Sequence, residues 1–201
     1  MKILQTITDV LAVNTYYLVV GNEAIVIDGG TDGQAVLSYA RQNGFTVKYM
    51  LLTHTHYDHA SCSKFLQDNG VKIVVSSLEA DGLSNDELNV SIYSKIKFEH
   101  LSPDITFEDG EVLDLLGIKI KCMLTKGHTK GSTCFMVDNV IFSGDTLFCE
   151  GVGRFDLAGG SGRELLTSLK KLMAIEGDYI VYPGHGEQTT LSHERLYNPY
   201  L

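Results

Sequence analysis

The chain has 201 residues, of which 44% are hydrophobic and 20% charged, and its formal net charge is -9 at pH 7. This length predicts one compact domain spanning residues 1–201, and the ordinary composition excludes wholesale disorder. The acidic charge and the scattered Lys and Arg residues argue against a nucleic-acid partner, because neutralising phosphates requires clustered basic residues.

Two features of the sequence indicate the cellular compartment. The start, MKILQTITDVLAV, lacks a signal-peptide pattern, and no apolar run approaches the ~18 to 20 residues that span a bilayer. The four cysteines show no C-x-x-C pair and no disulfide-framework spacing, which is typical of free and mostly buried thiols. Cys62 and Cys149 come close to candidate site residues, but no nucleophilic role is expected of them. We therefore expect a cytoplasmic protein without a membrane partner.

The first half of the chain alternates β-rich and helical patterns. Helical spacing predicts helices over 32–44 and 58–70, each closed by Asn-Gly. Residues 77–103 are polar with weak periodicity, and we expect them to cover one end of a sheet. The predicted strands of this half lie at 2–7, 14–21, 23–27, 47–54 and 71–77.

The second half repeats this order. A helix is predicted over 162–175. Two halves, each a run of strands followed by helix and strand, predict two sheets packed face to face with helices outside. The expected fold class is therefore α/β, a four-layer αββα sandwich. The predicted strands of this half lie at 110–117, 118–125, 132–139, 140–146 and 178–186.

Three of the seven histidines and one aspartate fall within six residues, in the stretch HTHYDH at 54–59. Alternate side chains of an extended segment share a face, so His54 and His56 are expected to point the same way from a strand end. Asp58 and His59 follow at the turn into a helix, where Asp58 could equally be an N-cap and His59 a surface residue. The two preceding histidines favour a metal site.

Three later segments share one design, an apolar strand followed by a glycine-flanked loop with a single ligand-type residue. They are CMLTKGHTKGS with His128, VIFSGDTLF with Asp145, and YIVYPGHGEQ with His185. Each alone would be an ordinary polar loop residue, but the three together favour a shared site. His100 and His193 remain as expected surface residues.

These positions offer five imidazoles and two carboxylates. Nitrogen and oxygen ligands without thiolate suit zinc, with iron or manganese as alternatives. Seven ligands are too many for one tetrahedral ion, so we predict two divalent ions that share one carboxylate and each keep an open position. The predicted partition places His54, His56 and His128 on the first ion, Asp58, His59 and His185 on the second, and Asp145 between them.

The order HTHYDH, GHTKGS, GDTLF and GHG resembles the metallo-β-lactamase superfamily, and more closely its glyoxalase II branch. The similarity is to the short bacterial hydroxyacylglutathione hydrolases, which lack a C-terminal helical domain, and it covers nearly the whole chain with the same ligand partition. It implies the metallo-β-lactamase fold. It also implies that Arg154 contacts the thiol carrier and that Asp28 orients a metal ligand, although Asp28 could simply start a turn with Gly29 and Gly30.

The resemblance implies a binuclear metal-dependent hydrolase of a small thioester, an S-acyl or hydroxyacyl glutathione or a related thiol adduct. Two ions ~3.5 to 4 Å apart lower the pKa of a shared water toward ~7, and the bridging hydroxide would attack the thioester carbonyl. Asp58 would be the catalytic residue, holding its metal and orienting the hydroxide. The thiolate, whose conjugate acid has a pKa of ~8.5, leaves without a strong general acid.

Other functions of the same superfamily compete with this hypothesis. The main alternative is a persulfide dioxygenase, which holds one iron with the counterparts of His54, His128 and Asp145 and has a G-x-G-R segment like GVGR here. A β-lactamase is disfavoured because Asp145 as a bridging ligand and the missing signal peptide do not fit it. The acidic charge argues against a nuclease, and open coordination positions argue against a purely structural metal module.

Overall fold

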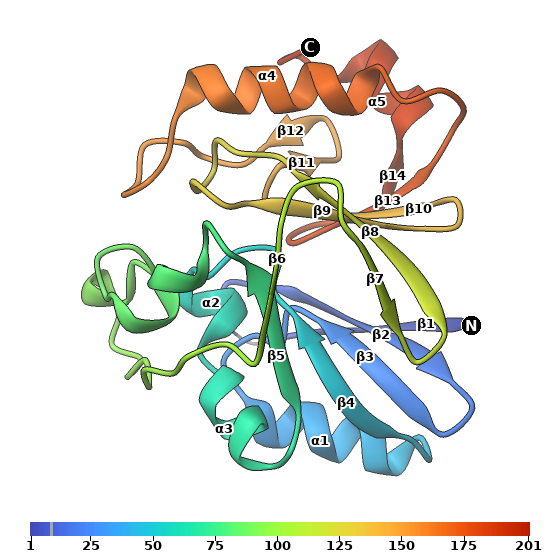
Figure 1. Ribbon diagram of the computed structural model, residues 1–201. Helices are drawn as coiled ribbons and strands as arrows, with labels where there is room; N and C mark the ends of the chain where they lie inside the picture. Colours follow the sequence, from blue (N-terminus) through green and yellow to red (C-terminus); the bar gives the residue numbers. More distant parts are fainter. Residues whose placement is uncertain (9) are drawn as a thin grey trace.

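The structure is a computed structural model that describes residues 1–8 and 10–201. Two six-stranded sheets pack face to face, and helices cover the outer face of each (Figure 1). The predicted four-layer αββα sandwich, the metallo-β-lactamase fold, is therefore confirmed. None of the helices within the described ranges is long and apolar enough to cross a membrane.

The first sheet has the strand order β1-β2-β3-β4-β5-β6, antiparallel from β1 to β3 and parallel from β3 to β6. Its strands are β1 (Lys2–Ile7), β2 (Asn14–Val20), β3 (Glu23–Ile27), β4 (Thr46–Leu51), β5 (Lys72–Ser76) and β6 (Ile105–Phe107). The helices of this half are α1 (Gly33–Gln42), α2 (Tyr57–Ala60) and α3 (Ser63–Asp68).

The second sheet has the order β14-β13-β10-β9-β8-β7, in which only the neighbours β10 and β13 of the described strands run parallel. Its strands are β7 (Val112–Leu115), β8 (Ile118–Leu124), β9 (Thr133–Val137), β10 (Val140–Gly144), β13 (Ile180–Pro183) and β14 (Thr189–Thr190). A separate hairpin joins β11 (Leu147–Phe148) to β12 (Gly151–Val152), and the outer helices are α4 (Gly162–Met173) and α5 (Leu191–Tyr197).

Strand β3 shows why the apolar runs of the sequence form central strands. Its Ala24 and Val26 pack into the core beneath α1 and α3, whereas Ile25 and Ile27 pack into the core between the sheets. Successive side chains of a strand point to opposite faces, so a strand covered on both faces must be apolar throughout. The apolar run at 47–54 behaves in the same way, because Met50 of β4 lies in the core beneath the helices and Leu51 in the core between the sheets.

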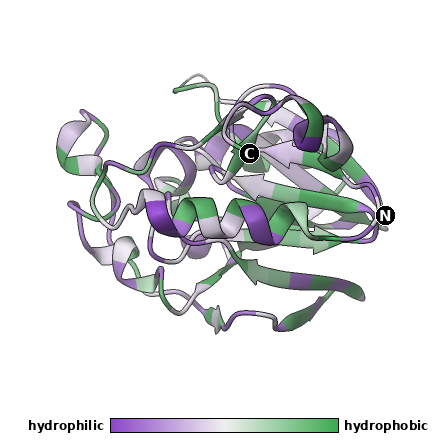
Figure 2. Ribbon diagram, turned by 90° about the horizontal axis from the view of Figure 1, so that it is seen from above, coloured by the Kyte–Doolittle hydropathy of each residue, from purple (hydrophilic) through white to green (hydrophobic). Residues whose placement is uncertain are grey.

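The two long helices begin at side-chain caps. The Asp32 carboxylate accepts a hydrogen bond from the N–H of Ala35 at the start of α1, and Ser161 caps α4 in the same way through Glu164. Helix α4 lies on the outside of the second sheet, and hydrophilic and hydrophobic residues alternate along it in Figure 2. Its apolar face, which includes Leu165, packs against that sheet.

The single helix predicted over 58–70 is wrong, because the chain forms the two short helices α2 and α3 instead. The N–H of Cys62 donates to the carbonyl of Gly30 (3.1 Å), and the N–H of Gly30 donates to the carbonyl of His59 (3.0 Å). The backbone at the break thus bonds to the loop after β3. This contact fixes α2, with Asp58 and His59, against that loop.

The segment 77–103 lies at one end of the sandwich, as predicted (Figure 1). It contains the short 3₁₀ helices η1 (Ala80–Ser84) and η2 (Ser91–Tyr93). Leu83 and Phe98 from this segment are buried in the core beneath the first sheet. The segment is therefore anchored by a few apolar side chains although most of its residues are polar.

Candidate metal centre

All seven predicted ligands lie at one edge of the sandwich, where strands of both sheets end. His54 and His56 follow β4, and Asp58 and His59 belong to α2. The other three ligands, His128, Asp145 and His185, follow β8, β10 and β13. Strand β4 ends at Leu51, so His54 and His56 lie in a loop and not on an extended strand end as the sequence suggested. Their rings are nevertheless adjacent, with centroids 4.7 Å apart.

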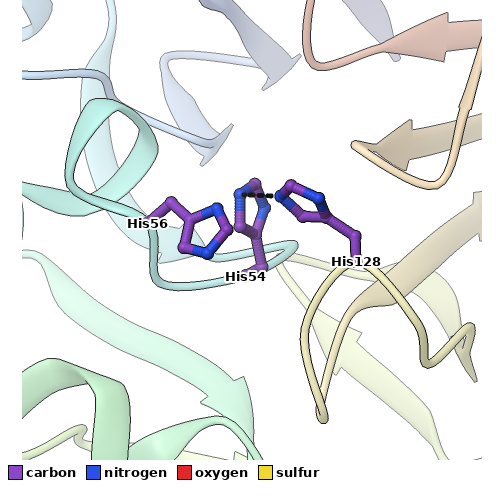
Figure 3. Close-up of side chains that lie close together, drawn as sticks. All are labelled: His54, His56 and His128. Carbon is purple, nitrogen blue, oxygen red and sulfur yellow. Dashed lines mark hydrogen bonds between the residues drawn. The ribbon is translucent and has the colours of Figure 1, made fainter. Parts of the chain in front are cut away.

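The first cluster consists of His54, His56 and His128, whose side chains converge in Figure 3. Ring nitrogens of the three lie within 4.8 Å of one another, and His54 Nε2 is 3.2 Å from His128 Nε2. All three residues are buried. The first predicted group of ligands is therefore together in space.

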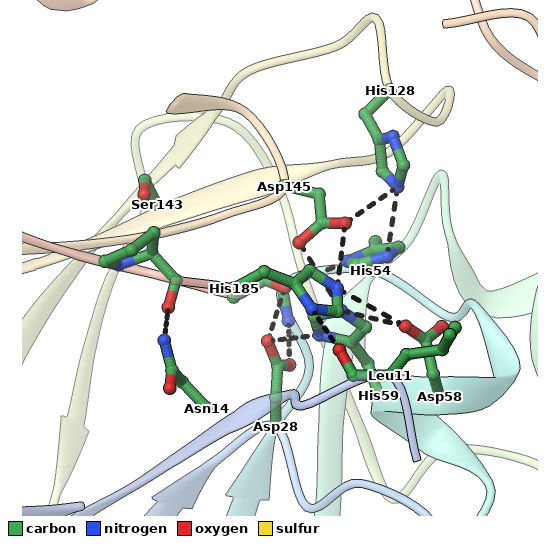
Figure 4. Close-up of polar contacts among 12 residues, drawn as sticks. Leu11, Asn14, Asp28, His54, Asp58, His59, His128, Ser143, Asp145 and His185 are labelled. Carbon is green, nitrogen blue, oxygen red and sulfur yellow. Dashed lines mark hydrogen bonds and ion pairs between the residues drawn. The ribbon is translucent and has the colours of Figure 1, made fainter. Parts of the chain in front are cut away.

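The second cluster consists of Asp58, His59 and His185, whose ligand atoms also lie within 4.8 Å of one another. The Nε2 atoms of His59 and His185 are 3.2 Å apart. Asp58 Oδ2 is 3.4 Å from His185 Nε2 and 3.7 Å from His59 Nε2. The second predicted group is together as well (Figure 4).

Asp145 lies between the two clusters (Figure 4). Its Oδ1 is 3.4 Å from His59 Nε2, and its Oδ2 is 3.6 Å from His128 Nε2 and 3.4 Å from His185 Nε2. A Cβ on Gly184 would lie 2.2 Å from Asp145 Oδ1 and 2.7 Å from His59 Cε1. Only glycine therefore permits this approach of the His185 loop to the carboxylate.

The Nδ1 contacts of the histidines determine which ring nitrogen faces the site. Carbonyl and carboxylate oxygens only accept hydrogen bonds, so an Nδ1 beside one carries a proton, and in the neutral ring Nε2 keeps its lone pair. Three Nδ1 atoms donate in this way, His128 to the Arg154 carbonyl (2.6 Å), His185 to the Leu11 carbonyl (2.9 Å), and His59 to Asp28 Oδ2 (2.9 Å).

His54 follows the same rule through a hydroxyl. Thr53 Oγ1 donates its hydrogen to Asp28 Oδ2 at 2.7 Å. The same oxygen therefore accepts from His54 Nδ1 at 3.1 Å, which leaves the Nε2 of His54 unprotonated. In their neutral forms, the four rings thus point their Nε2 lone pairs into the two clusters.

This arrangement fits two divalent cations. The unprotonated Nε2 atoms of His54 and His128, 3.2 Å apart, cannot hydrogen-bond to each other. His56 Nε2 and Asp145 Oδ1 are buried and have no hydrogen-bond partner within the described part of the chain. Buried polar atoms are almost always paired, so such atoms call for a bound group. Neutral imidazoles and carboxylates are the donors that zinc, iron and manganese take.

The two clusters differ in their electrostatics. Burial, reinforced by the neighbouring imidazoles, lowers the pKa of His54 well below its usual value and that of His56 to about 3. Burial would also lower the pKa of His59, but nearby carboxylates, Asp145 first, outweigh it and raise this pKa to about 9. His54 and His56 of the first cluster are therefore neutral, whereas the second cluster is surrounded by carboxylates.

Asp28 supports both clusters from behind. In addition to its contacts with His59 and the Thr53 hydroxyl, its Oδ1 accepts from the N–H of Thr53 at 2.9 Å. Its own backbone has a φ of +50°, which is uncommon for a residue with a side chain. Asp28 therefore both begins the turn before Gly29 and contacts two ligand-bearing segments.

Two further residues near the site have no recognisable signal in the sequence. Asn14 Nδ2 donates to the carbonyls of Pro183 (3.0 Å) and Gly186 (2.8 Å), which flank His185. Glu79, in the segment 77–103, is buried and contacts the loops that carry the first cluster. Both look like ordinary polar residues in the sequence, and only their tertiary contacts distinguish them.

A cavity of about 460 Å³ opens over the two clusters. Arg154 lines it, and its Nε and Nη2 donate to the carboxylate of Asp156 at 2.7 and 2.9 Å. The guanidinium is thus paired with Asp156, and the backbone carbonyl of Arg154 accepts the hydrogen bond from His128 Nδ1. The apolar part of the wall consists of Leu11, Tyr57, Val90, Tyr93, Phe148 and Leu157.

The cysteines and the remaining histidines agree with the sequence predictions. All four cysteines are free, and Cys62, Cys122 and Cys134 are buried. Burial raises the pKa of the Cys62 thiol, so this residue is no nucleophile despite its proximity to α2. His100 and His193 have partly exposed side chains and pair with Asp86 and Glu150.

The sequence is similar to a known protein family and to individual proteins along most of its length. A family model described as "Metallo-beta-lactamase superfamily" matches residues 8–185. A protein of Streptococcus pyogenes named "probable metallo-hydrolase" is 34% identical, over 100% of this chain and 90% of its own length. The hydroxyacylglutathione hydrolase GloC of Haemophilus influenzae is 32% identical, over 89% of this chain and 87% of its own.

Two solved structures share the fold over nearly the whole chain. BLEG-1, described as a B3 metallo-beta-lactamase, has a TM-score of 0.93 at 28% identity and covers 100% of this chain and 99% of its own. TTHA1623, solved in a di-iron-bound form, has a TM-score of 0.87 at 28% identity. The match covers 98% of this chain and 100% of TTHA1623. One neighbour thus carries two metal ions on this fold.

Proposed function

The chain belongs to the metallo-β-lactamase superfamily and is a metallo-hydrolase, and from this premise we propose that it hydrolyses small thioesters of the S-acyl glutathione type with two metal ions. The similarity to a hydroxyacylglutathione hydrolase over 89% of the chain supports the thioester class. The di-iron neighbour supports two ions, with zinc, iron or manganese as the metal.

The observation that carries the proposal is the position of Asp145 between two clusters of three ligands. His54, His56 and His128 would hold the first ion, and Asp145 would be shared. The second ion would be held by Asp58, His59 and His185. When bound, the two ions supply Lewis acidity and lower the pKa of water toward ~7.

The chain's own residues supply orientation. Burial alone would raise the pKa of Asp58, but His59 and His185 outweigh it and lower this pKa below its usual value. Asp58 therefore lines the cavity as a carboxylate that accepts a hydrogen bond from the attacking water. A thiolate leaving group, with a conjugate-acid pKa of ~8.5, departs without a general acid.

Arg154 is the proposed contact for the thiol half of the substrate. Replacing it with alanine is expected to raise KM for S-lactoylglutathione about 10-fold and to leave kcat within about 2-fold, because one charge-assisted hydrogen bond to a glutathione carboxylate is lost. Asp156→Ala is the matched variant, since it frees the guanidinium and should lower KM. An unchanged KM in Arg154→Ala would contradict this role.

The proposed function is tested with S-lactoylglutathione, a simple amide and a β-lactam, while metal ions per chain are counted on the same sample. We expect the thioester to be hydrolysed at least about 100-fold faster than the amide or the β-lactam, because an amine leaving group requires a proton at departure. Preferential β-lactam hydrolysis would contradict the proposal and align the chain with its B3 neighbour in activity.

A persulfide dioxygenase is the second candidate function. His54 Nε2 is 3.2 Å from His128 Nε2, which is 3.6 Å from Asp145 Oδ2, so a two-histidine, one-carboxylate set exists within the seven ligands. Such a set suits a single iron and O₂ chemistry. One iron per chain, with O₂ uptake on glutathione persulfide and no thioester turnover, would favour this function instead.

A further inference from the structure

Glu79 is a buried carboxylate between the two loops that carry the first cluster, and it is only 3% exposed. Its Oε1 accepts hydrogen bonds from the N–H (3.0 Å) and the hydroxyl (2.8 Å) of Thr55. Its Oε2 accepts from the Thr129 hydroxyl and the Gly131 N–H, both at 2.9 Å. One carboxylate therefore joins a loop of the first sheet to a loop of the second.

The contacts of Glu79 parallel those of Asp28. In the segment THTH at 53–56, the N–H and hydroxyl of Thr53 both donate to Asp28, and those of Thr55 both donate to Glu79. Each threonine directly precedes a histidine of the first cluster. Fixing both donors of a threonine restricts the backbone from which the next imidazole projects.

The two carboxylates differ in which cluster they reach. Asp28 also accepts from His59 Nδ1 at 2.9 Å, so it contacts the second cluster directly. The other partner loop of Glu79 begins at Thr129, the residue after His128. Among the residues that the structure describes, the Glu79 carboxylate therefore bonds only to the two loops that supply the first cluster.

The fit around Glu79 is close. A Cβ on Gly131 would lie 2.7 Å from both the N and the Cβ of Glu79, and 2.8 Å from its Oε2. Thr129 is held in turn by Ser132, whose Oγ accepts from the Thr129 N–H at 3.0 Å. The loop after β8 thus closes its backbone onto the carboxylate, and a shift of Glu79 would displace that loop.

We propose that Glu79 is a positioning residue that sets the separation of His54 and His56 from His128, and thereby the affinity of the first metal ion but not of the second. This inference rests on the two-ion centre of the proposed function. In Glu79→Gln, the amide NH₂ group replaces one carboxylate oxygen and faces hydrogen-bond donors, so the bonds to that oxygen are lost. Its first ion is expected to bind about 10- to 100-fold more weakly, with the second ion within about 2-fold.

The test is a titration of the metal-free full-length protein with Co²⁺, followed by visible absorption, with Zn²⁺ counted per chain after dialysis. His56→Ala and His185→Ala supply reference spectra for loss of the first and the second ion. Glu79→Gln should reproduce the His56→Ala spectrum, and Asp28→Asn should weaken the second ion. These readouts do not depend on catalytic turnover.

Glu194→Gln is the matched control. Glu194 is another fully buried carboxylate, and it accepts from the Thr189 hydroxyl (2.5 Å), the Glu150 N–H (2.9 Å) and Asn198 Nδ2 (2.7 Å) near α5. It touches neither ligand loop of the first cluster through these bonds. Its variant should bind both ions as the wild type does.

Thr129→Val and Thr129→Ser provide a second route if Glu79→Gln does not fold. Valine removes one of the four bonds to Glu79 and should weaken the first ion alone, and serine should restore its affinity. The inference is overturned if these variants hold both ions with wild-type affinity, or lose both equally. A wild-type chain that holds fewer than two ions would instead contradict the proposed function.

Discussion

Replacing Asp145 with alanine is expected to lower kcat/KM for the thioester on the order of 10³-fold, about 4 kcal/mol of transition-state stabilisation. The reason is that its two oxygens lie 3.4 to 3.6 Å from Nε2 atoms of both clusters, so one substitution removes a ligand from each proposed ion. Steady-state kinetics measures the loss. Metal counting should show about one ion per chain where the wild type holds two.

The control for this prediction is Asp114→Ala, which removes an exposed carboxylate that pairs with Lys119 on the second sheet. It should retain wild-type turnover and both ions. Should Asp145→Ala retain two ions and unreduced turnover, Asp145 would not be the shared ligand, and the partition of the seven residues would have to be revised.

Removing the metal ions is expected to lower the melting temperature by about 8 to 16 °C for each ion lost. An ion present at 1,000 times its Kd contributes about 4 kcal/mol to the free energy of unfolding, and 1 kcal/mol corresponds to about 2 to 4 °C for a chain of this size. Without cations, the unprotonated Nε2 atoms of His54 and His128 face each other at 3.2 Å, and the buried atoms His56 Nε2 and Asp145 Oδ1 stay unpaired.

Circular dichroism with and without a chelator measures this shift, and two equivalents of Zn²⁺ should restore both the melting temperature and the activity. A double variant, His56→Ala with His185→Ala, tests whether the chelator itself destabilises the protein. Its melting temperature should be the same in both conditions. If the wild type also melts at the same temperature after complete removal of the ions, the site does not couple metal binding to stability.

The ligand residues could be found from the sequence because each follows an apolar strand in a short polar loop. His128, Asp145 and His185 are such cases, and parallel or adjacent strands bring their ends to one edge of the sandwich. The double burial of β4, where Met50 and Leu51 enter different cores, was predictable for a related reason, since a continuous apolar run is stable only between two covering layers.

Other features depend on contacts between distant residues and were therefore missed. The break between α2 and α3 forms because Cys62 bonds to Gly30, and the local pattern there remains helical. Strands β11, β12 and β14 have two residues each, too few for any periodicity. Glu79 is one acidic residue in a polar segment, and its four donors come from loops far away in the sequence.

The contribution of ligands by both sheets has a consequence for the order of folding. His59 and His185, whose Nε2 atoms are 3.2 Å apart, are separated by 126 positions along the chain. Contacts of such long range form late, because their loop-closure entropy must first be offset by packing of the sheets. Bound ions would therefore slow unfolding of the finished protein and leave its folding rate nearly unchanged.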